Sequence, residues 1–396
     1  MLTRAATIWL LLTGILFAES ATGQLAWKSK VQNLGQGTAA VADGQIFAPI
    51  YGGSGLVSMN ASNGEIRWQM QFHDTSPFPP IIDRDAVYVI TSSCTLYSVS
   101  RATGKTLWSL WLAGSIDSMP TLCEGKIYAA SSDYKNHGSR PGGWHLICLE
   151  AATGKELWAR HIGADIVGAP LVSHGEVYVC TTNGILTAVD TRTGKALWAR
   201  GMDARSMPAL CRDWLVFHSD TGLAAANRKD GTQAWKYEPE RATGHQRPRS
   251  FTYPMIAGDR AFVSLGNNDM TCLDLERRAP IWTWSAEGQV LGDPVMVGGR
   301  VYFGTADGSF LSLNARTGQT LWAVKTDGTI ADAPAIMDGK IYVHDQKGAL
   351  ICLDAGTATA TGWGCWGGNP AHTGDREPMG QPVVVTPSAA DEGEDE

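Results

Sequence analysis

LYSVSRATGKTLW, Leu96 to Trp108, is the stretch that decides the fold, because versions of it recur along nearly the whole chain. Other full copies are LICLEAATGKELW, LTAVDTRTGKALW and FLSLNARTGQTLW, which end at Trp158, Trp198 and Trp322. Weaker copies end at Trp68, Trp235 and Trp282, and a last copy from Leu350 has lost its tryptophan. Self-similarity at a period of about 40 residues indicates a repeat architecture.

Each copy has the pattern of a β-hairpin. Apolar residues alternate up to an Asp, Asn or Glu, then Thr-Gly or Asn-Gly forms a tight turn, and a second strand starts at Leu-Trp. Between copies lies a second paired element, made of a proline, an apolar run, a polar turn and Val/Ile-Tyr, as in APLVSHGEVYV around His174-Gly175. Each unit is therefore predicted to hold four strands, A to D.

The two ends of the repeat array complement each other. The last unit has A, B and C strands but no D strand, whereas the segment around Trp27 is a D strand that precedes the first unit. We therefore expect an all-β, eight-bladed β-propeller of four-stranded antiparallel blades, closed by the N-terminal strand. The A–B hairpins of these blades start near Ala39, Pro79, Pro120, Pro170, Pro208, Pro254, Pro294 and Pro334. Docking between blades is predicted for Trp27, Trp68, Trp108, Trp158, Trp198, Trp235, Trp282 and Trp322.

The repeat L-x-x-L-D-x-x-T-G-x-x-L-W covers nearly all of residues 27–363 and resembles that of the PQQ-repeat, or quinoprotein alcohol dehydrogenase-like, β-propellers. That family includes enzymes that use pyrroloquinoline quinone (PQQ) and non-catalytic BamB-like members, which are outer-membrane assembly factors. The resemblance implies that a PQQ enzyme would have an adjacent Cys-Cys pair, a Glu/Asn/Asp set for Ca²⁺ and an Asp base. This chain has no Cys-Cys pair. It therefore resembles the BamB-like members more.

Few residues suggest catalysis or metal binding. The nine histidines form neither H-E-x-x-H nor an i, i+4 pair, and no C-x-x-C occurs. The closest approach to a set of oxygen ligands is Asn267, Asn268 and Asp269. Ca²⁺ needs about six to eight oxygen ligands, which three consecutive residues cannot supply. We interpret them as turn formers. No catalytic residue, metal or cofactor is predicted, with PQQ plus Ca²⁺ as the alternative.

Two repeats carry insertions that predict a binding surface. The excess is residues 132–144, between strands B and C, and residues 239–250, between strands D and A. Both kinds of connection leave the same face of a four-stranded meander, and long loops on a regular scaffold tend to carry function. Basic clusters suit a protein or an anionic ligand; two solvated loops are the alternative. The predicted binding residues are Lys135, His137, Arg140, Trp144, Arg241, His245, Arg247 and Arg249.

Other polar and aromatic residues on this scaffold have simpler interpretations. Trp144 and Trp214 lie outside the docking positions and are the stacking candidates of a glycan-binding propeller, although Trp214 also suits packing within a blade. Turn chemistry accounts for most of the aspartates that recur just before strand A, on the face of the long loops. These are Asp117, Asp165, Asp203, Asp293 and Asp332.

The ends of the chain differ from its repeats. Residues 1–23 predict a secretory signal peptide, with a charged Arg4, an apolar run from Thr7 to Ala18 and small residues at Ala21 and Gly23. The apolar run is too short to span a bilayer, and no cysteine follows it for lipid attachment. We expect the propeller in residues 24–375, with Trp363 or Trp366 packed against the closing blade. Residues 376–396 predict a disordered acidic tail.

The composition of the chain limits the classes of function that it can have. With 44% hydrophobic residues the chain can bury one large core, and a pI of about 5.7 disfavours nucleic-acid binding. The eight cysteines recur in repeat positions that keep equivalents apart, which favours buried thiols over several disulfides; one bridge involving Cys94, Cys180 or Cys365 is the alternative. The sequence predicts a secreted or periplasmic monomer without a transmembrane span after signal removal, acting as a non-catalytic binding scaffold. A PQQ-dependent alcohol or sugar dehydrogenase is the alternative, and a glycan-binding propeller the second.

Overall fold

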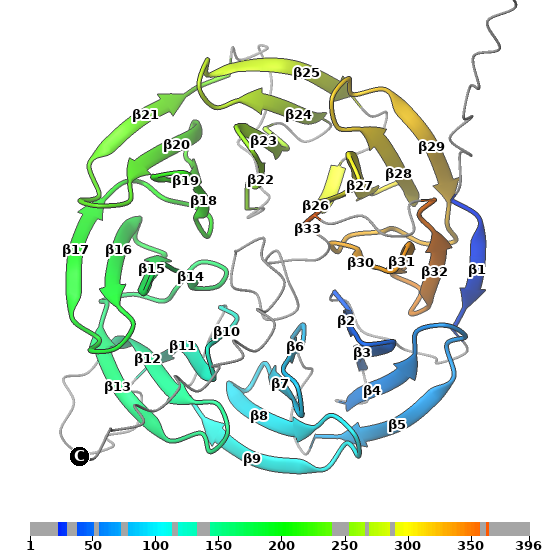
Figure 1. The fold of residues 1–396 in the computed structure, drawn as a ribbon, viewed down its shortest axis with the longest axis horizontal. Helices are drawn as coiled ribbons and strands as arrows, with labels where there is room; N and C mark the ends of the chain where they lie inside the picture. The colour runs from blue at the N-terminus through cyan, green and yellow to red at the C-terminus, as the bar shows by residue number, and fades with distance from the viewer. Residues whose placement is uncertain are drawn as a thin grey trace, which may run out of the picture.

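The computed structural model describes residues 23–29, 38–50, 55–72, 78–112, 118–132, 143–239, 253–265, 269–285, 290–356 and 362–363. Within these ranges the regular elements are all strands, and no helix there is long and apolar enough to cross a membrane. The strands form eight antiparallel sheets arranged as a ring, with the A strands around the axis and the D strands outermost (Figure 1). The predicted eight-bladed propeller is confirmed.

The blades follow one another along the chain. Blade 1 is β2 (Ala40–Ala42), β3 (Gln45–Ile50), β4 (Gly55–Asn60) and β5 (Ile66–Gln71). Blade 2 is β6 (Ile81–Ile82), β7 (Ala86–Ile90), β8 (Thr95–Ser100) and β9 (Thr106–Trp111). Blade 3 is β10 (Thr121–Cys123), β11 (Lys126–Ser132), β12 (Trp144–Glu150) and β13 (Glu156–His161). Blade 4 is β14 (Leu171–Ser173), β15 (Glu176–Cys180), β16 (Ile185–Asp190) and β17 (Ala196–Gly201).

The second half of the ring repeats this order. Blade 5 is β18 (Ala209–Cys211), β19 (Trp214–Ser219), β20 (Gly222–Asn227) and β21 (Gln233–Tyr237). Blade 6 is β22 (Met255–Ala257), β23 (Arg260–Val263), β24 (Asp269–Asp274) and β25 (Ala279–Ser285). Blade 7 is β26 (Val290–Val297), β27 (Arg300–Thr305), β28 (Ser309–Asn314) and β29 (Thr320–Lys325). Blade 8 is β30 (Ala335–Met337), β31 (Lys340–His344), β32 (Leu350–Asp354) and β1 (Leu25–Lys28).

Six of the eight tryptophans predicted to dock are hydrogen-bonded to the next blade, whereas the indole N–H groups of Trp235 and Trp322 are buried without a partner. In blade 2 the indole N–H of Trp108 donates to the carbonyl oxygen of Ala151, in the C–D turn of blade 3, at 3.1 Å, and the hydroxyl of Tyr88 donates to the same oxygen. Burying an indole contributes up to about 4–6 kcal/mol. Equivalent bonds to the next blade, between 2.9 and 3.2 Å, are made by Trp27, Trp68, Trp158, Trp198 and Trp282.

The ring is closed by the N-terminal strand. β1 pairs with β32, with Leu25 opposite Leu353 and Trp27 opposite Cys352, so the first described strand becomes the outer strand of the last blade (Figure 1). The ammonium group of Lys28 also lies 2.8 Å from the carboxylate of Asp327. The expected closure is therefore confirmed.

The C-terminal segment pairs at a different place from the one expected. β33 (Gly362–Trp363) adds to β26, opposite Val297 and Met296, and therefore extends the inner edge of blade 7. The strand of Trp363 thus pairs one blade before the closing blade. Trp366 lies outside the described residues.

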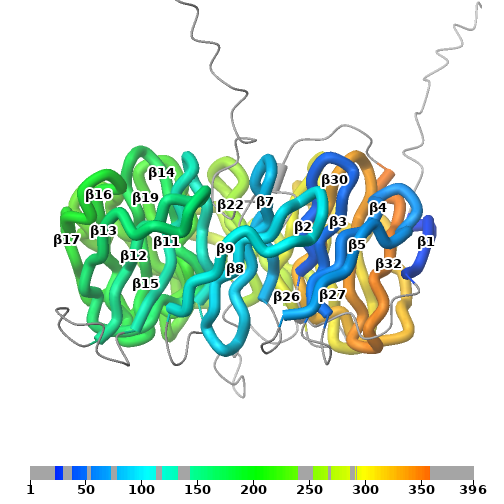
Figure 2. Tube along the Cα trace, turned by 90° about the horizontal axis from the view of Figure 1, so that it is seen from below, coloured from blue at the N-terminus to red at the C-terminus, as the bar shows by residue number. Residues whose placement is uncertain are grey.

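The D–A connections and B–C turns share one face of the ring, which we call the crossover face. The chain leaving strand D is hydrogen-bonded to the B–C turn of its own blade: the N–H of Leu112 donates to Cys94, that of Met202 to Gly184, and that of Thr326 to Gly308. Figure 2 shows the ring from the side, with the turns collected at its two flat faces. The predicted common face of the two insertions follows from this topology.

Candidate functional site

Most of the predicted binding residues lie in the two inserted loops, outside the described residues: Lys135, His137, Arg140, Arg241, His245, Arg247 and Arg249. Their described ends are on the crossover face. The first loop leaves β11 after Ser132 and returns at Trp144, and the second connects blade 5 to blade 6. The structure thus fixes where both loops start and end, and their basic surface stays a prediction.

Trp144 and Trp214 are packing residues in this fold. Trp144 is half-buried at the start of β12, packs against the core clusters on both sides of blade 3, and accepts a hydrogen bond at its carbonyl from Ile162. Trp214 is half-buried, and its ring centroid lies 6.0 Å from that of Trp235. The contact agrees with the interpretation of Trp214 as blade packing, and stacking of a glycan on Trp144 stays a prediction.

The aspartates before strand A have different environments. Asp165 is 7% exposed, and its carboxylate accepts from the N–H of Ile166 at 2.7 Å and from the hydroxyl of Ser118 at 3.2 Å. Asp203 is exposed, with a positive φ of 51°. Asp269 likewise bridges its turn, accepting from the N–H of Leu265 at 3.2 Å. Turn chemistry therefore accounts for Asp165 and Asp269; Asp117, Asn267 and Asn268 lie outside the described residues.

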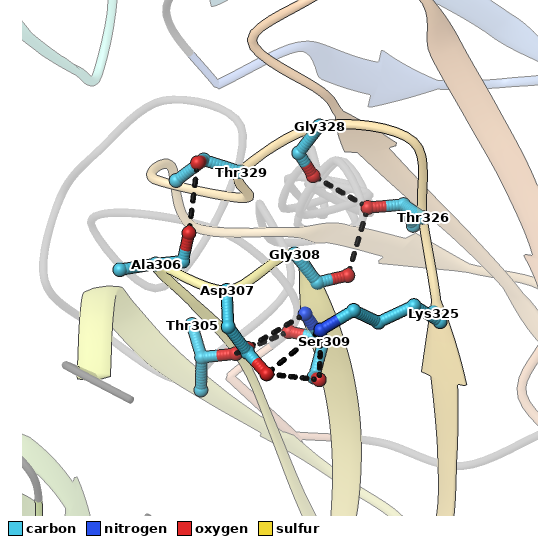
Figure 3. Close-up of polar contacts among 9 residues, drawn as sticks. All are labelled: Thr305, Ala306, Asp307, Gly308, Ser309, Lys325, Thr326, Gly328 and Thr329. Carbon is cyan, nitrogen blue, oxygen red and sulfur yellow. Dashed lines mark hydrogen bonds and ion pairs between the residues drawn. The ribbon is translucent and has the colours of Figure 1, made fainter. Parts of the chain in front are cut away.

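The best-ordered polar cluster on the crossover face is the β27–β28 turn of blade 7 (Figure 3). The carboxylate of Asp307 accepts from the ammonium group of Lys325 at 2.7 Å and from the hydroxyl of Thr305 at 2.5 Å. These donors hold the pKa of the Asp307 carboxyl well below its usual range. The hydroxyls of Thr326 and Thr329 donate to backbone carbonyls of the same turn and connection. These hydrogen bonds attach the connection after β29 to the β27–β28 turn of the same blade. A carboxylate that is held ionised cannot serve as a general acid.

Burial shifts the pKa values of several described titratable groups away from neutrality. Burial raises the pKa of the thiols of Cys148 and Cys352 to about 11 and that of Tyr88 to about 12. Burial also lowers the pKa of His218 to about 4, so its imidazole is neutral at pH 7. General acids and bases, and activated thiols, have pKa values moved toward the working pH. The pKa values of Cys148, Cys352, Tyr88 and His218 therefore reflect burial in the core.

The cysteines behave as core residues. Cys148, Cys180, Cys272 and Cys352 are buried free thiols, which confirms the preference over several disulfides and rules out Cys180 as the partner of a single bridge. The thiol of Cys94 donates to the carbonyl oxygen of Ser92 at 3.8 Å. Cys365 lies outside the described residues.

An apolar layer that the sequence analysis missed lines the start of the inner strands. In five blades the residue that precedes the proline opening strand A belongs to one hydrophobic cluster, and those in blades 4, 5, 6 and 8 are at most 5% exposed. In blade 7 this position holds Asp293, which is buried. The sequence signal that could have predicted these buried residues is their repeated position directly before a proline. The layer consists of Met119, Ala169, Met207, Tyr253 and Ala333.

This layer does not fit PQQ with Ca²⁺. PQQ is a planar polycarboxylate and needs cationic groups and hydrogen-bond donors, whereas the side chains here are apolar and packed together. In the part of the chain that the structure describes, no three His, Cys, Asp or Glu side chains come together as a metal site requires.

The seam between blades 5 and 6 departs from the common docking. Elsewhere a C–D turn glycine faces the docked tryptophan, but here Arg278 takes that place, with a φ of 57° and the same turn hydrogen bond to Asp274. The indole N–H of Trp235 is buried without a hydrogen-bond partner. The strand-B residue in register with it is Val216, where the other blades have Phe or Tyr, and its ring instead meets the edge of Trp214 at 86°. The C–D turn of blade 6, ERRAP at residues 276–280, contains no glycine. This absence is the sequence signal that could have predicted the unusual seam.

Solved structures share the fold at low identity. The crystal structure of BamB from Moraxella catarrhalis matches with 19% identity over 84% of this chain and 88% of its own, at a TM-score of 0.50. Quinohemoprotein alcohol dehydrogenase from Comamonas testosteroni matches with 14% identity over 85% and 77%, at 0.64. Saccharomyces cerevisiae Sqt1 matches with 12% identity over 84% and 99%, at 0.70.

The family comparison is more specific than these structural matches. No curated protein matches the sequence. A family model described as outer membrane protein assembly factor BamB matches residues 14–132, 116–246 and 219–362, which together cover most of the chain. The tryptophan-docked ring and this match agree, and the chain belongs to the PQQ-repeat β-propeller family of BamB.

Proposed function

We propose that this protein is an exported, non-catalytic β-propeller that binds a protein partner in the cell envelope, as a BamB-like scaffold. The observation that carries the proposal is the buried apolar layer at the inner strands, where residues that precede the strand-A prolines of five blades pack in one hydrophobic cluster. The family match supports the scaffold and the envelope location together.

The electrostatics of the described residues support a binding role without chemistry. Every resolved pKa shift among them moves away from neutrality: the carboxyl groups down, His218 down, and the thiol, tyrosine and basic groups up. No side chain so tuned is ready to exchange a proton at pH 7. We propose that the protein needs neither metal nor cofactor and acts as a monomer.

The partner surface that we propose is the crossover face where the two basic loops start. Their described ends lie on that face, and the charges are those of residues 135–140 and 241–249. Clustered arginines bind carboxylate-bearing surfaces in bidentate geometry. The partner is therefore an acidic protein surface or an anionic ligand, and nucleic acid is disfavoured by the acidic pI of about 5.7.

The first test is a titration of the purified protein with PQQ and Ca²⁺, followed by tryptophan fluorescence and calorimetry. We expect no saturable heat or fluorescence change up to about 100 μM, a range that covers the Kd of ordinary cofactor sites. Stoichiometric binding at micromolar affinity would reject the scaffold proposal and favour an alcohol or sugar dehydrogenase.

The second test locates the partner surface in cells of the native source. A photo-crosslinker placed at Arg247 should capture a defined envelope protein, and replacing Arg247 and Arg249 by Ala should weaken that complex with little change in thermal stability. The matched control replaces Lys105 and Lys155 by Ala, because these exposed charges lie in C–D turns on the opposite face. Equal loss in both variants would show that only overall charge matters. Recovery of the protein from the cytoplasm alone would contradict the envelope location.

A further inference from the structure

A glycine and a tryptophan meet at nearly every seam of the ring. The C–D turn of six blades presents a glycine with positive φ to the tryptophan of the preceding blade, and a Cβ built on that glycine would lie 2.4–2.9 Å from the indole. Real Cβ atoms do not come so close to a ring, so only glycine fits beneath the docked indole. The pairs are Gly64 with Trp27, Gly104 with Trp68, Gly154 with Trp108, Gly194 with Trp158, Gly231 with Trp198 and Gly318 with Trp282.

Blade 8 cannot form such a turn, because its C strand is β32 and its D strand is β1 from the other end of the chain. The tryptophan that faces this gap is Trp322 of blade 7, which is 9% exposed. A docking surface for it must come from residues that are not joined as a hairpin.

Gly23 supplies that surface. Its φ is +124°, and a Cβ there would lie 2.8 Å from Cε3 of Trp322 and 3.0 Å from Cγ2 of Val324. The next residue is fixed to the end of β32, since the carbonyl oxygen of Gln24 accepts from the N–H of Asp354 at 2.9 Å. Gly23 therefore occupies, from the start of the chain, the place that a C–D turn glycine occupies at six other seams.

We infer that Gly23 is the closing glycine of the ring, and that the leader is removed by a cut N-terminal to Gly23. The inference rests on the export that is part of the proposed function. It moves the boundary of the leader upstream of the Gly23–Gln24 bond that the Ala21-x-Gly23 pattern indicates. A cut after Gly23 would remove the residue on which Trp322 packs.

The sequence offers a suitable bond just upstream. Ala18 and Ser20 form a second small-x-small pattern that ends before Ala21. A leader peptidase acting there hydrolyses the Ser20–Ala21 peptide bond with water, which leaves a carboxylate on Ser20 and an amino group on Ala21. The mature chain then begins Ala-Thr-Gly and keeps its closing glycine.

One experiment tests ring closure with purified protein. A chain that begins at Gln24 should unfold at a temperature at least about 3 °C below that of a chain that begins at Ala21, because Trp322 loses its cover. Gly23→Ala, in a chain that begins at Ala21, should show a similar loss. Gly143→Ala is the matched control, because Gly143 has a similar φ of +119° but a Cβ there meets only the movable ring of His161.

A second experiment reads the cut itself. The protein is recovered from the envelope of a host that exports it, and intact mass and N-terminal sequencing identify the first residue. A start at Ala21, or at another residue before Gln24, supports the inference. A start at Gln24 overturns it, as do equal stabilities of the two purified chains. An exported but uncut chain overturns the processing step only, whereas an uncut chain confined to the cytoplasm also contradicts the proposed export.

Discussion

Replacing Arg278 by glycine should stabilise the ring, because every other hairpin C–D turn for which a docking contact is described has glycine there. Arg278 holds a φ of 57°, which costs a residue with a Cβ about 1–2 kcal/mol. Its side chain is exposed, so little contact is lost on removing it. The greater freedom of glycine in the unfolded chain offsets roughly 0.5–1 kcal/mol of the gain.

The second part of the gain concerns Trp235. The N–H of Trp235 is buried without a partner, and we expect the Cβ at this turn position to keep the indole out of the common docking geometry. In the Arg278→Gly variant the ring can move in and donate to the next blade, as Trp198 does to Arg228 at 3.0 Å. That bond adds about 1 kcal/mol. The expected net increase in the free energy of unfolding is roughly 1–2 kcal/mol.

Urea unfolding of Arg278→Gly and the wild type measures this difference directly. A double-mutant cycle with Trp235→Phe separates the two parts, since the Phe substitution should cost about 1 kcal/mol more when residue 278 is glycine. Gly231→Ala, at a neighbouring seam where the Cβ would lie 2.4 Å from Trp198, is the opposing control and should destabilise. An Arg278→Gly variant that is no more stable than the wild type would refute the reasoning.

Three further predictions follow from burial. Burial lowers the pKa of His218 from 6.5 to about 4. The unfolded chain therefore binds a proton below pH 6.5 that the folded ring does not, and the free energy of unfolding should fall by about 2–3 kcal/mol between pH 7.5 and 4.5 from this group. Urea unfolding at both pH values should show a smaller fall in His218→Gln; an identical fall would contradict the assignment. Trp198→Ala should cost roughly 3–5 kcal/mol, since Trp198 is only 7% exposed, and an unchanged melting temperature would count against docking. The thiols of Cys148, Cys180, Cys272 and Cys352 should react with iodoacetamide at pH 8 only after unfolding, as mapped by mass spectrometry, because burial raises their pKa; fast labelling of the native protein would disprove this.

The fold was predictable because its information is local and repeated. Each Thr-Gly turn and each docked tryptophan lie within one short hairpin, so the spacing from Trp108 to Trp158 and onward counts the blades directly. The lone D strand at Trp27 predicted the closure that pairs Leu25 with Leu353. These features need no knowledge of which distant residues meet.

The details of the inner layer and the seams depend on contacts between blades, which no single repeat contains. Met207 and Tyr253 become buried because neighbouring blades converge toward the axis, and their sequence neighbourhoods differ too much to signal this. In the sequence Arg278 belongs to a weak copy of the repeat, and nothing there indicates that it faces Trp235. The structure brings the two residues to the same seam between blades. For the two predicted basic loops, the structure describes only the residues at which they start and end.

The position of β1 in blade 8 determines when the ring can close during synthesis of the chain. Leu25 is among the first residues made, but its partner Leu353 follows 353 − 25 = 328 residues later. At roughly 5–20 residues per second, the strand waits on the order of 20 s to a minute before it can pair. Throughout that time the growing molecule is an open arc with an unpaired apolar strand at one end and an uncovered blade edge at the other. Closure of the ring is therefore a late event, and a chain cut short before β32 lacks the partner that β1 requires.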